Sequence, residues 1–175
     1  MSVDLHASQE QGFFDGPVDH LFAMPVLVEY AGRIRVAEKW SSKLGGCPLA
    51  FVHKTRDTTR PNVAVANRVV GEVKGKDCVL VDDMIDTAGT ITEAVKVLTK
   101  AGARKVIIVA THGILSAPAT SRLSECGADE VVVTDTLPIP ADKRFPTLTI
   151  LSIAPLLARA IREVFDDGSV TSLFD

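Results

Sequence analysis

The middle of the chain alternates short apolar runs, rich in valine and isoleucine, with segments whose apolar residues recur at helical spacing. Four of these runs have the length of buried strands, at residues 78–81, 105–111, 130–134 and 148–152. Strands that alternate with helices form βαβ units, whose strands are parallel and whose helices cover the sheet. The sequence therefore predicts an α/β fold with an open parallel sheet flanked by helices.

Helical spacing follows the first, second and fourth of these runs, and each predicted helix ends near a glycine: Gly102, Gly127 or Gly168. The last helix is predicted to place six apolar residues on one face: Ile153, Leu156, Leu157, Ala160, Ile161 and Val164. Upstream, the pattern predicts a helix at residues 33–44, a strand at 48–53 and an exposed polar loop at 54–62.

Composition excludes several classes of protein. With 175 residues, 46% of them hydrophobic and 23% charged, the chain is sized for one compact globular domain. A net charge of −3 gives no general attraction for nucleic acid. The longest purely apolar run, residues 106–110, is far too short to span a membrane, and the N-terminus resembles no secretory signal. We therefore expect a cytoplasmic protein whose three cysteines are reduced thiols.

The stretch most informative about chemistry is residues 79–90, which read VLVDDMIDTAGT. It predicts a strand that ends in acids and turns through small residues into a helix. Backbone N–H groups of residues 87–90 would lie at the helix N-terminus, where the dipole favours a phosphate, and Ala88 and Gly89 are small enough for an anion to approach. Asp82 and Asp83 could accept hydrogen bonds from vicinal sugar hydroxyls or hold a hydrated Mg²⁺.

Each of these residues also has a purely structural interpretation. Thr90 and Glu93 fit a capping box that does no more than start the helix. Asp82 and Asp83 could be solvated loop acids. Because three carboxylates within five residues repel one another unless a cation or sugar compensates, we favour the functional interpretation for the acids.

Residues 79–90 resemble the phosphoribosyl-pyrophosphate-binding signature of the type I phosphoribosyltransferase fold, in the wording of the ribose-phosphate pyrophosphokinase family. Two further blocks are similar to that family: residues 4–15, which read DLHASQEQGFFD, and residues 111–119, which read THGILSAPA. The ending at residues 169–174, SVTSLF, is similar as well. The resemblance covers essentially the whole chain.

The resemblance implies transfer of the β,γ-pyrophosphoryl group of ATP to the 1-hydroxyl of ribose 5-phosphate, which gives phosphoribosyl pyrophosphate and AMP. It implies that Asp82 and Asp83 bind the ribose hydroxyls, that Lys54 is the catalytic lysine, and that Arg56 accompanies it. His6 matches the family's Mg²⁺-associated histidine. The loop matched to the 5-phosphate comprises Asp86, Thr87, Ala88, Gly89 and Thr90.

The chain departs from the family pattern in two places. The family precedes the helix at residues 33–44 with a strand and a metal-binding Asp, whereas here a short helical pattern at residues 25–30 runs directly into Ala31, with Tyr30 in place of the Asp. The family also carries an N-terminal domain of the same fold that grips adenine. We therefore interpret residues 1–24 as a remnant of that domain and residues 25–175 as the C-terminal phosphoribosyltransferase-like domain.

Three functions are compatible with these observations. The first is a ribose-phosphate pyrophosphokinase impaired by truncation, which uses Mg²⁺ and forms a homo-oligomer that binds neither nucleic acid nor membranes. The second is a non-catalytic paralogue that binds ribose phosphates and regulates an intact enzyme. The third is another phosphoribosyltransferase, which would need a base-recognising hood that the sequence does not reveal.

Overall fold

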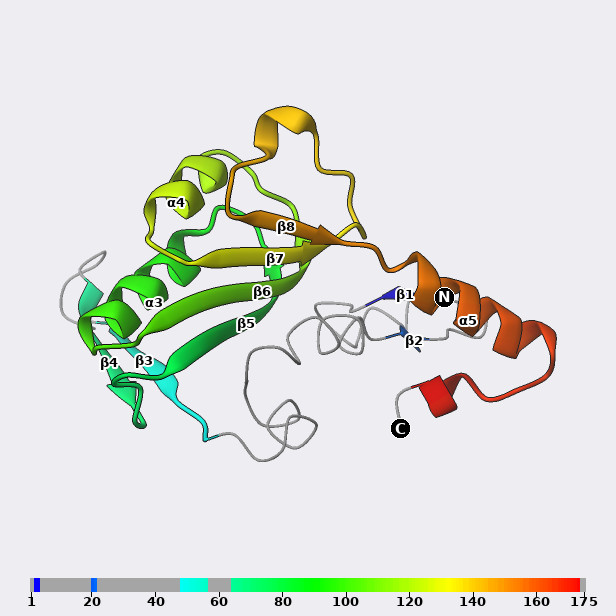
Figure 1. Ribbon diagram of the computed structural model, residues 1–175, viewed down its shortest axis with the longest axis horizontal. Coiled ribbons are helices and arrows are strands. Elements are labelled where there is room, and N and C mark those ends of the chain that lie inside the picture. Colours follow the sequence, from blue (N-terminus) through cyan, green and yellow to red (C-terminus); the bar gives the residue numbers. More distant parts are fainter. Residues whose placement is uncertain (1, 4–19, 22–47, 57–63, 174–175) are drawn as a thin grey trace.

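The computed structural model describes residues 2–3, 20–21, 48–56 and 64–173 (Figure 1). Its main sheet has four parallel strands in the order β5, β6, β7, β8. These strands span Asp77–Ile85 (β5), Lys105–Gly113 (β6), Glu130–Thr134 (β7) and Leu148–Leu151 (β8). The helices span Gly89–Lys100 (α3), Ala119–Glu125 (α4) and Ala154–Phe165 (α5), with 3₁₀ turns at Ala141–Lys143 (η2) and Val170–Leu173 (η3). The predicted α/β class and parallel sheet are confirmed.

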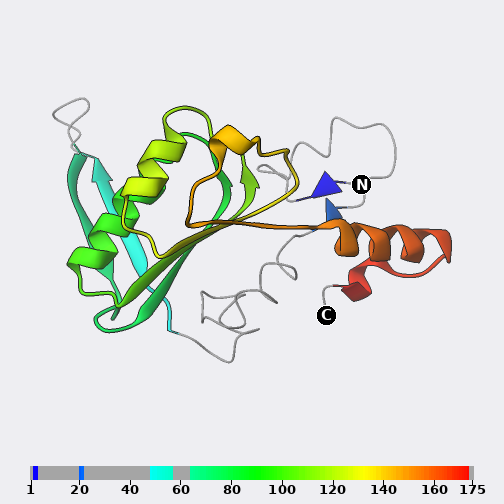
Figure 2. The same cartoon turned by 45° about the horizontal axis from the view of Figure 1, so that its top comes forward.

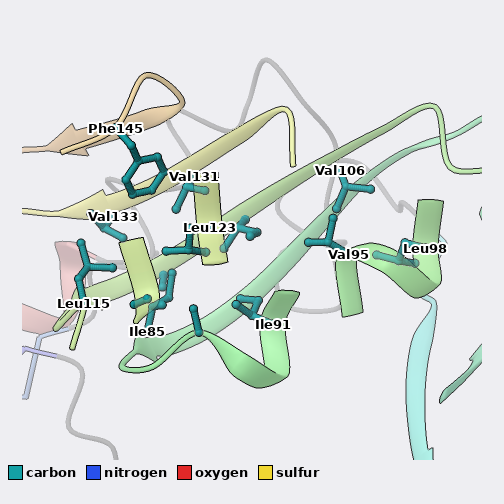
Figure 3. Close-up of a cluster of buried hydrophobic side chains, with 14 of the residues drawn as sticks. Ile85, Ile91, Val95, Leu98, Val106, Leu115, Leu123, Val131, Val133 and Phe145 are labelled. Atoms are coloured by element: carbon teal, nitrogen blue, oxygen red, sulfur yellow. The ribbon is translucent and has the colours of Figure 1, made fainter. Parts of the chain in front are cut away.

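The larger hydrophobic cluster lies between one face of this sheet and helices α3 and α4 (Figure 3). Every second residue of β6 contributes to it, and α4 adds Ala119 and Leu123. The intervening residues Ile107 and Val109 belong to a second cluster on the opposite face, together with Val132 and Ile153. Because both faces of the central strands are buried, their sequences are continuously apolar rather than alternating.

Two short strand pairs complete the described structure. β3 (Phe51–Arg56) and β4 (Ala64–Val70) pair antiparallel, while β1 (Ser2–Val3) and β2 (His20–Leu21) pair parallel. The prediction of an exposed loop at residues 54–62 is therefore wrong for its first three residues, because Lys54–Arg56 belong to β3. The sequence-predicted strand at 48–53 begins later, at Phe51, and β4 was not predicted. Backbone pairing with β4 overrides the polar composition of residues 54–56 at the end of β3.

The last helix differs from its predicted packing. Leu156 and Ala160 are fully buried, but Ile161 and Val164 of the same predicted face are 56% and 48% exposed. Figures 1 and 2 show α5 extending away from the sheet beyond β8, so its second half has no strand beneath it. No helix among the described residues is long and apolar enough to cross a membrane. The helix predicted at residues 33–44 lies outside the described residues.

Candidate ribose phosphate site

The candidate site lies where β5 and β6 end side by side. The two strands stay in register to their last residues, with Ile85 opposite Gly113. Residues 86–88 then connect β5 to α3, which begins at Gly89. We call residues 86–90 the phosphate loop. In open α/β sheets this edge, at the carboxyl ends of the strands, is where ligands bind.

The phosphate loop contains a left-handed residue. Ala88 is the N-cap of α3, adopts φ 60° and ψ 6°, and is 6% exposed. The capping box, which is the structural alternative for Thr90 and Glu93, does not form: α3 has no side-chain cap hydrogen bond, and Glu93 instead pairs with Lys96 at 2.6 Å. The helix therefore begins without a side chain that satisfies its first amides.

The first hydrogen bond of α3 runs from the Thr92 amide to the Ala88 carbonyl, at 3.1 Å. Within the described part of the chain, the amides of residues 87–91 donate no hydrogen bond to another backbone group. These donors lie at the positive end of a 12-residue helix. Helix N-termini of this kind commonly bind phosphate in proteins, and phosphate binding at this one stays a prediction.

The two predicted sugar-binding acids lie inside β5 rather than after it, which corrects the predicted strand end. Asp82 pairs in register with Ala110, and the strand continues for three residues beyond it. The Asp83 amide donates to Oδ1 of Asp82 at 2.9 Å, and the Met84 amide donates to Oδ1 of Asp83 at 2.8 Å. Asp82 is exposed and Asp83 is half-buried. Both carboxylates are therefore oriented by backbone amides on the strand that leads into the phosphate loop.

The segment that follows β6 packs against the end of β5. Amides of Ile114 and Leu115 both donate to the Ile85 carbonyl, at 3.0 and 3.1 Å. Nδ1 of His112 lies 2.8 Å from Oγ1 of Thr136, so the imidazole is held at the carboxyl edge of the sheet. His112 pairs with Met84, so it lies at the same edge of the sheet as the end of β5.

A residue that sequence reasoning did not single out also contacts the phosphate loop. Nη1 of Arg122, on α4, donates to the Thr87 carbonyl at 2.9 Å across 35 residues of sequence. The helical pattern at residues 118–126 predicts α4. It does not predict that the exposed Arg122 contacts the turn between β5 and α3.

The remaining predicted site residues are only partly described. Lys54 and Arg56 lie in β3. Val52 of the same strand and Val69 of β4 pack against the larger hydrophobic cluster. The side chains of Lys54 and Arg56, and all of His6, lie outside what the structure describes. Among the described residues no group of three or more His, Cys, Asp or Glu side chains is arranged to hold a metal ion.

Two shifted pKa values lie far from this edge, at the start of β5. A hydrogen bond from Arg104 lowers the pKa of Asp77 and raises the pKa of Arg104 itself. Nη2 of Arg104 lies 2.6 Å from Oδ2 of Asp77. Burial raises the pKa of the neighbouring Cys78 thiol. The Asp77–Arg104 pair joins the start of β5 to the residue before β6, at the edge opposite the site, so we assign this pair a structural role.

Comparison with known proteins decides the family. Residues 50–175 match the phosphoribosyl synthetase-associated domain. The chain belongs to this family. It is 68% identical to a ribose-phosphate pyrophosphokinase of Bifidobacterium longum and 59% identical to one of Mycobacterium tuberculosis. Both alignments cover all of this chain but only 57% and 59% of those relatives, so the chain spans less than three fifths of their length.

A solved structure supports the same assignment. The phosphoribosylpyrophosphate synthetase of Mycobacterium smegmatis superposes with a TM-score of 0.83 at 59% identity, over 95% of this chain and 58% of that one. The alignment to the Bifidobacterium relative extends over 193 positions against 175 residues here, so at least 18 positions are gaps in this chain. This agrees with the internal segment expected to be missing, whose predicted place before Ala31 lies outside the described residues.

Proposed function

We propose that this chain carries the ribose 5-phosphate site of a ribose-phosphate pyrophosphokinase, the enzyme that transfers pyrophosphate from ATP to the 1-hydroxyl of the sugar. The observation that carries the proposal is the juxtaposition on one strand and turn of two oriented carboxylates and a row of helix N-terminal amides. Sugar hydroxyls donate hydrogen bonds to carboxylates, and a phosphate accepts them from amides. A phosphorylated sugar matches this order of acceptors and donors.

Each group has a defined task in the proposed reaction. The phosphate loop holds the 5-phosphate, and Asp82 and Asp83 hold the vicinal hydroxyls so that the 1-hydroxyl faces ATP. Lys54 and Arg56 are proposed to meet the negative charge that develops on the transferred group.

The donor set at this edge fits Mg²⁺. Mg²⁺ is usually held by one or two carboxylates together with waters and substrate phosphates rather than by a closed protein cage. Asp82 and Asp83 would supply such carboxylates as the alternative to binding the sugar hydroxyls, and His6 is the residue proposed to be associated with the ion. When bound, Mg²⁺ would neutralise charge on the pyrophosphoryl oxygens.

The wider setting follows from the same proposal. Ribose 5-phosphate, ATP and phosphoribosyl pyrophosphate would be the small-molecule partners, and cytoplasm would be the compartment in which they occur. A homo-oligomer that binds neither nucleic acid nor membranes remains our prediction.

Binding of three ligands tests the site. We expect calorimetry to show that the chain binds ribose 5-phosphate about tenfold more tightly than 2-deoxyribose 5-phosphate, because only the former offers a 2-hydroxyl to the carboxylates. Asp82→Asn and Asp83→Asn should reduce this preference while leaving the affinity for inorganic phosphate unchanged or tighter. Asp142→Asn, at an exposed acid of η2, is the matched control.

Two outcomes would contradict the proposal. One is equal affinity of the unaltered chain for the two sugar phosphates, which would remove the carboxylates from sugar recognition. The other is the absence of inorganic phosphate binding at millimolar concentration, which would remove the phosphate loop from the site.

A further inference from the structure

We propose that Arg122 is a positioning residue of the ribose 5-phosphate site, which fixes the backbone of the phosphate loop without contacting the sugar. The identity of the ligand rests on the proposed function. The effect of Arg122 on the loop does not, because it follows from a contact within the protein.

Arg122 reaches the loop from a well-anchored element. Its neighbours Ala119 and Leu123 are 0% and 1% exposed in the cluster beneath α4, so the helix that carries the guanidinium cannot shift freely. Nη1 lies 2.9 Å from the Thr87 carbonyl oxygen and 3.4 Å from the position that a Cβ on Gly89 would occupy. The guanidinium therefore lies close to the residues on either side of Ala88 in the sequence, Thr87 and Gly89.

The hydrogen bond orients a peptide group. The Thr87–Ala88 peptide is trans, since the cis bond that the described residues contain is Ala117–Pro118. In a trans peptide the carbonyl and the following N–H point in opposite directions. Because Arg122 holds the Thr87 carbonyl toward α4, the Ala88 N–H is directed away from α4.

The turn needs an external restraint. Ala88 has φ 60°, a left-handed conformation that is unfavourable for any residue with a Cβ. Side-chain capping does not offset this cost, because α3 has no cap hydrogen bond of that kind. The contact with Arg122 is a hydrogen bond from a charged donor, which is stronger than one from a neutral donor. It favours the strained turn over relaxed alternatives.

Loop order in the ligand-free protein is the first test. We expect Arg122→Met, which removes the donor, to lower the backbone ¹⁵N order parameters of residues 87–90. Arg122→Lys keeps a donor and should restore part of the order. Arg159→Met, at an exposed arginine of α5, controls for loss of one positive charge. Unchanged order parameters in Arg122→Met, with the fold intact by circular dichroism, would overturn the proposal.

Ligand affinity is the second test. By calorimetry, Arg122→Met should weaken binding of both ribose 5-phosphate and inorganic phosphate by about 3- to 10-fold, because the loop must then be ordered on binding. A loss of affinity with unchanged loop order would instead assign Arg122 a direct charge contact with the phosphate, and would overturn the positioning role. Failure of the unaltered chain to bind either ligand would refute the proposed function, while the order parameters would still decide the role of Arg122.

Discussion

Ala88 sets the shape of the phosphate loop because it adopts a left-handed backbone conformation while its methyl group is buried. Residues with a Cβ pay roughly 1–2 kcal/mol there, and β-branched residues more. We expect Ala88→Val to lower the free energy of unfolding by about 2–4 kcal/mol. Ala88→Gly should change it by less than about 1 kcal/mol, because relief of strain is offset by a more flexible unfolded chain.

Gly89 provides the matched comparison. Its φ lies outside the left-handed range, and an added Cβ would meet only Nη1 of Arg122, at 3.4 Å. Gly89→Ala should therefore be tolerated within about 1 kcal/mol in chemical denaturation. If Ala88→Val proved as harmless as Gly89→Ala, the left-handed turn would be absent in solution. The sequence locates small residues at this turn but does not tell which of them needs the unusual backbone, since that depends on where β5 ends.

Asp77 gives a pH-dependent contribution to stability. Its pKa is lowered chiefly by the hydrogen bond from Arg104, so the folded state favours the carboxylate. A depressed folded pKa contributes stability above the ordinary carboxyl range, near pH 4, and this contribution is lost as the pH falls through the lower folded value. Asp77→Asn should therefore lower the melting temperature near pH 7 but not near pH 2. A melting temperature lowered equally at both pH values would refute the electrostatic origin.

At the scale of elements, the central strands and helices were predictable because their signals are local. Continuous apolar runs such as Val131–Val133 indicate buried strands. Gly102 and Gly127 adopt the positive φ that is expected of a residue just after a helix. The β3–β4 hairpin was not predictable in this way. Thr55 pairs with Val65 across a bulge, so its strand character depends on a partner strand rather than on its own composition.

Helix α5 shows the same dependence on surroundings. Its sequence predicts one continuous apolar face, but the sheet ends at β8 and burial of that face stops after Ala160. We expect Leu156→Ala, at 0% exposure, to cost about 2–5 kcal/mol of unfolding free energy. Phe165→Ser, at 88% exposure, should cost less than about 0.5 kcal/mol. A large loss of stability in Phe165→Ser would mean that the end of α5 is covered in solution.

At the scale of the whole molecule, the successive parallel strands place all carboxyl ends at one edge. That rule made the location of the phosphate loop predictable from sequence because the loop follows β5, whereas Asp82 lies three residues before the end of that strand. Arg122 was not predictable, because its contact arises from the packing of α4 beside α3 on the same face of the sheet. Contacts between neighbouring helices depend on the tertiary fold. The spacing of residues within one helix does not predict them.

The same scale governs turnover. We expect a polypeptide of these 175 residues to bind ribose 5-phosphate but to release AMP from ATP far more slowly than the Bifidobacterium relative, of which it covers 57%. Orientation of two reactants is worth roughly 7–11 kcal/mol in a well-built site, so partial loss of the grip on ATP slows the reaction by several powers of ten. The charge stabilisation proposed for Lys54 and Arg56 would not compensate, because it acts only once the reactants are aligned.

The measurement is AMP release with ribose 5-phosphate, ATP and Mg²⁺, with the full-length Bifidobacterium relative as the positive control. Lys54→Ala is the matched variant, because it removes the proposed catalytic cation while leaving Asp82, Asp83 and the phosphate loop in place. Slow release that is insensitive to Lys54 is the expected result, since a site without aligned ATP gives that cation no transition state to stabilise. Rapid release that depends on Lys54 would show that residues within this chain already orient ATP against the sugar.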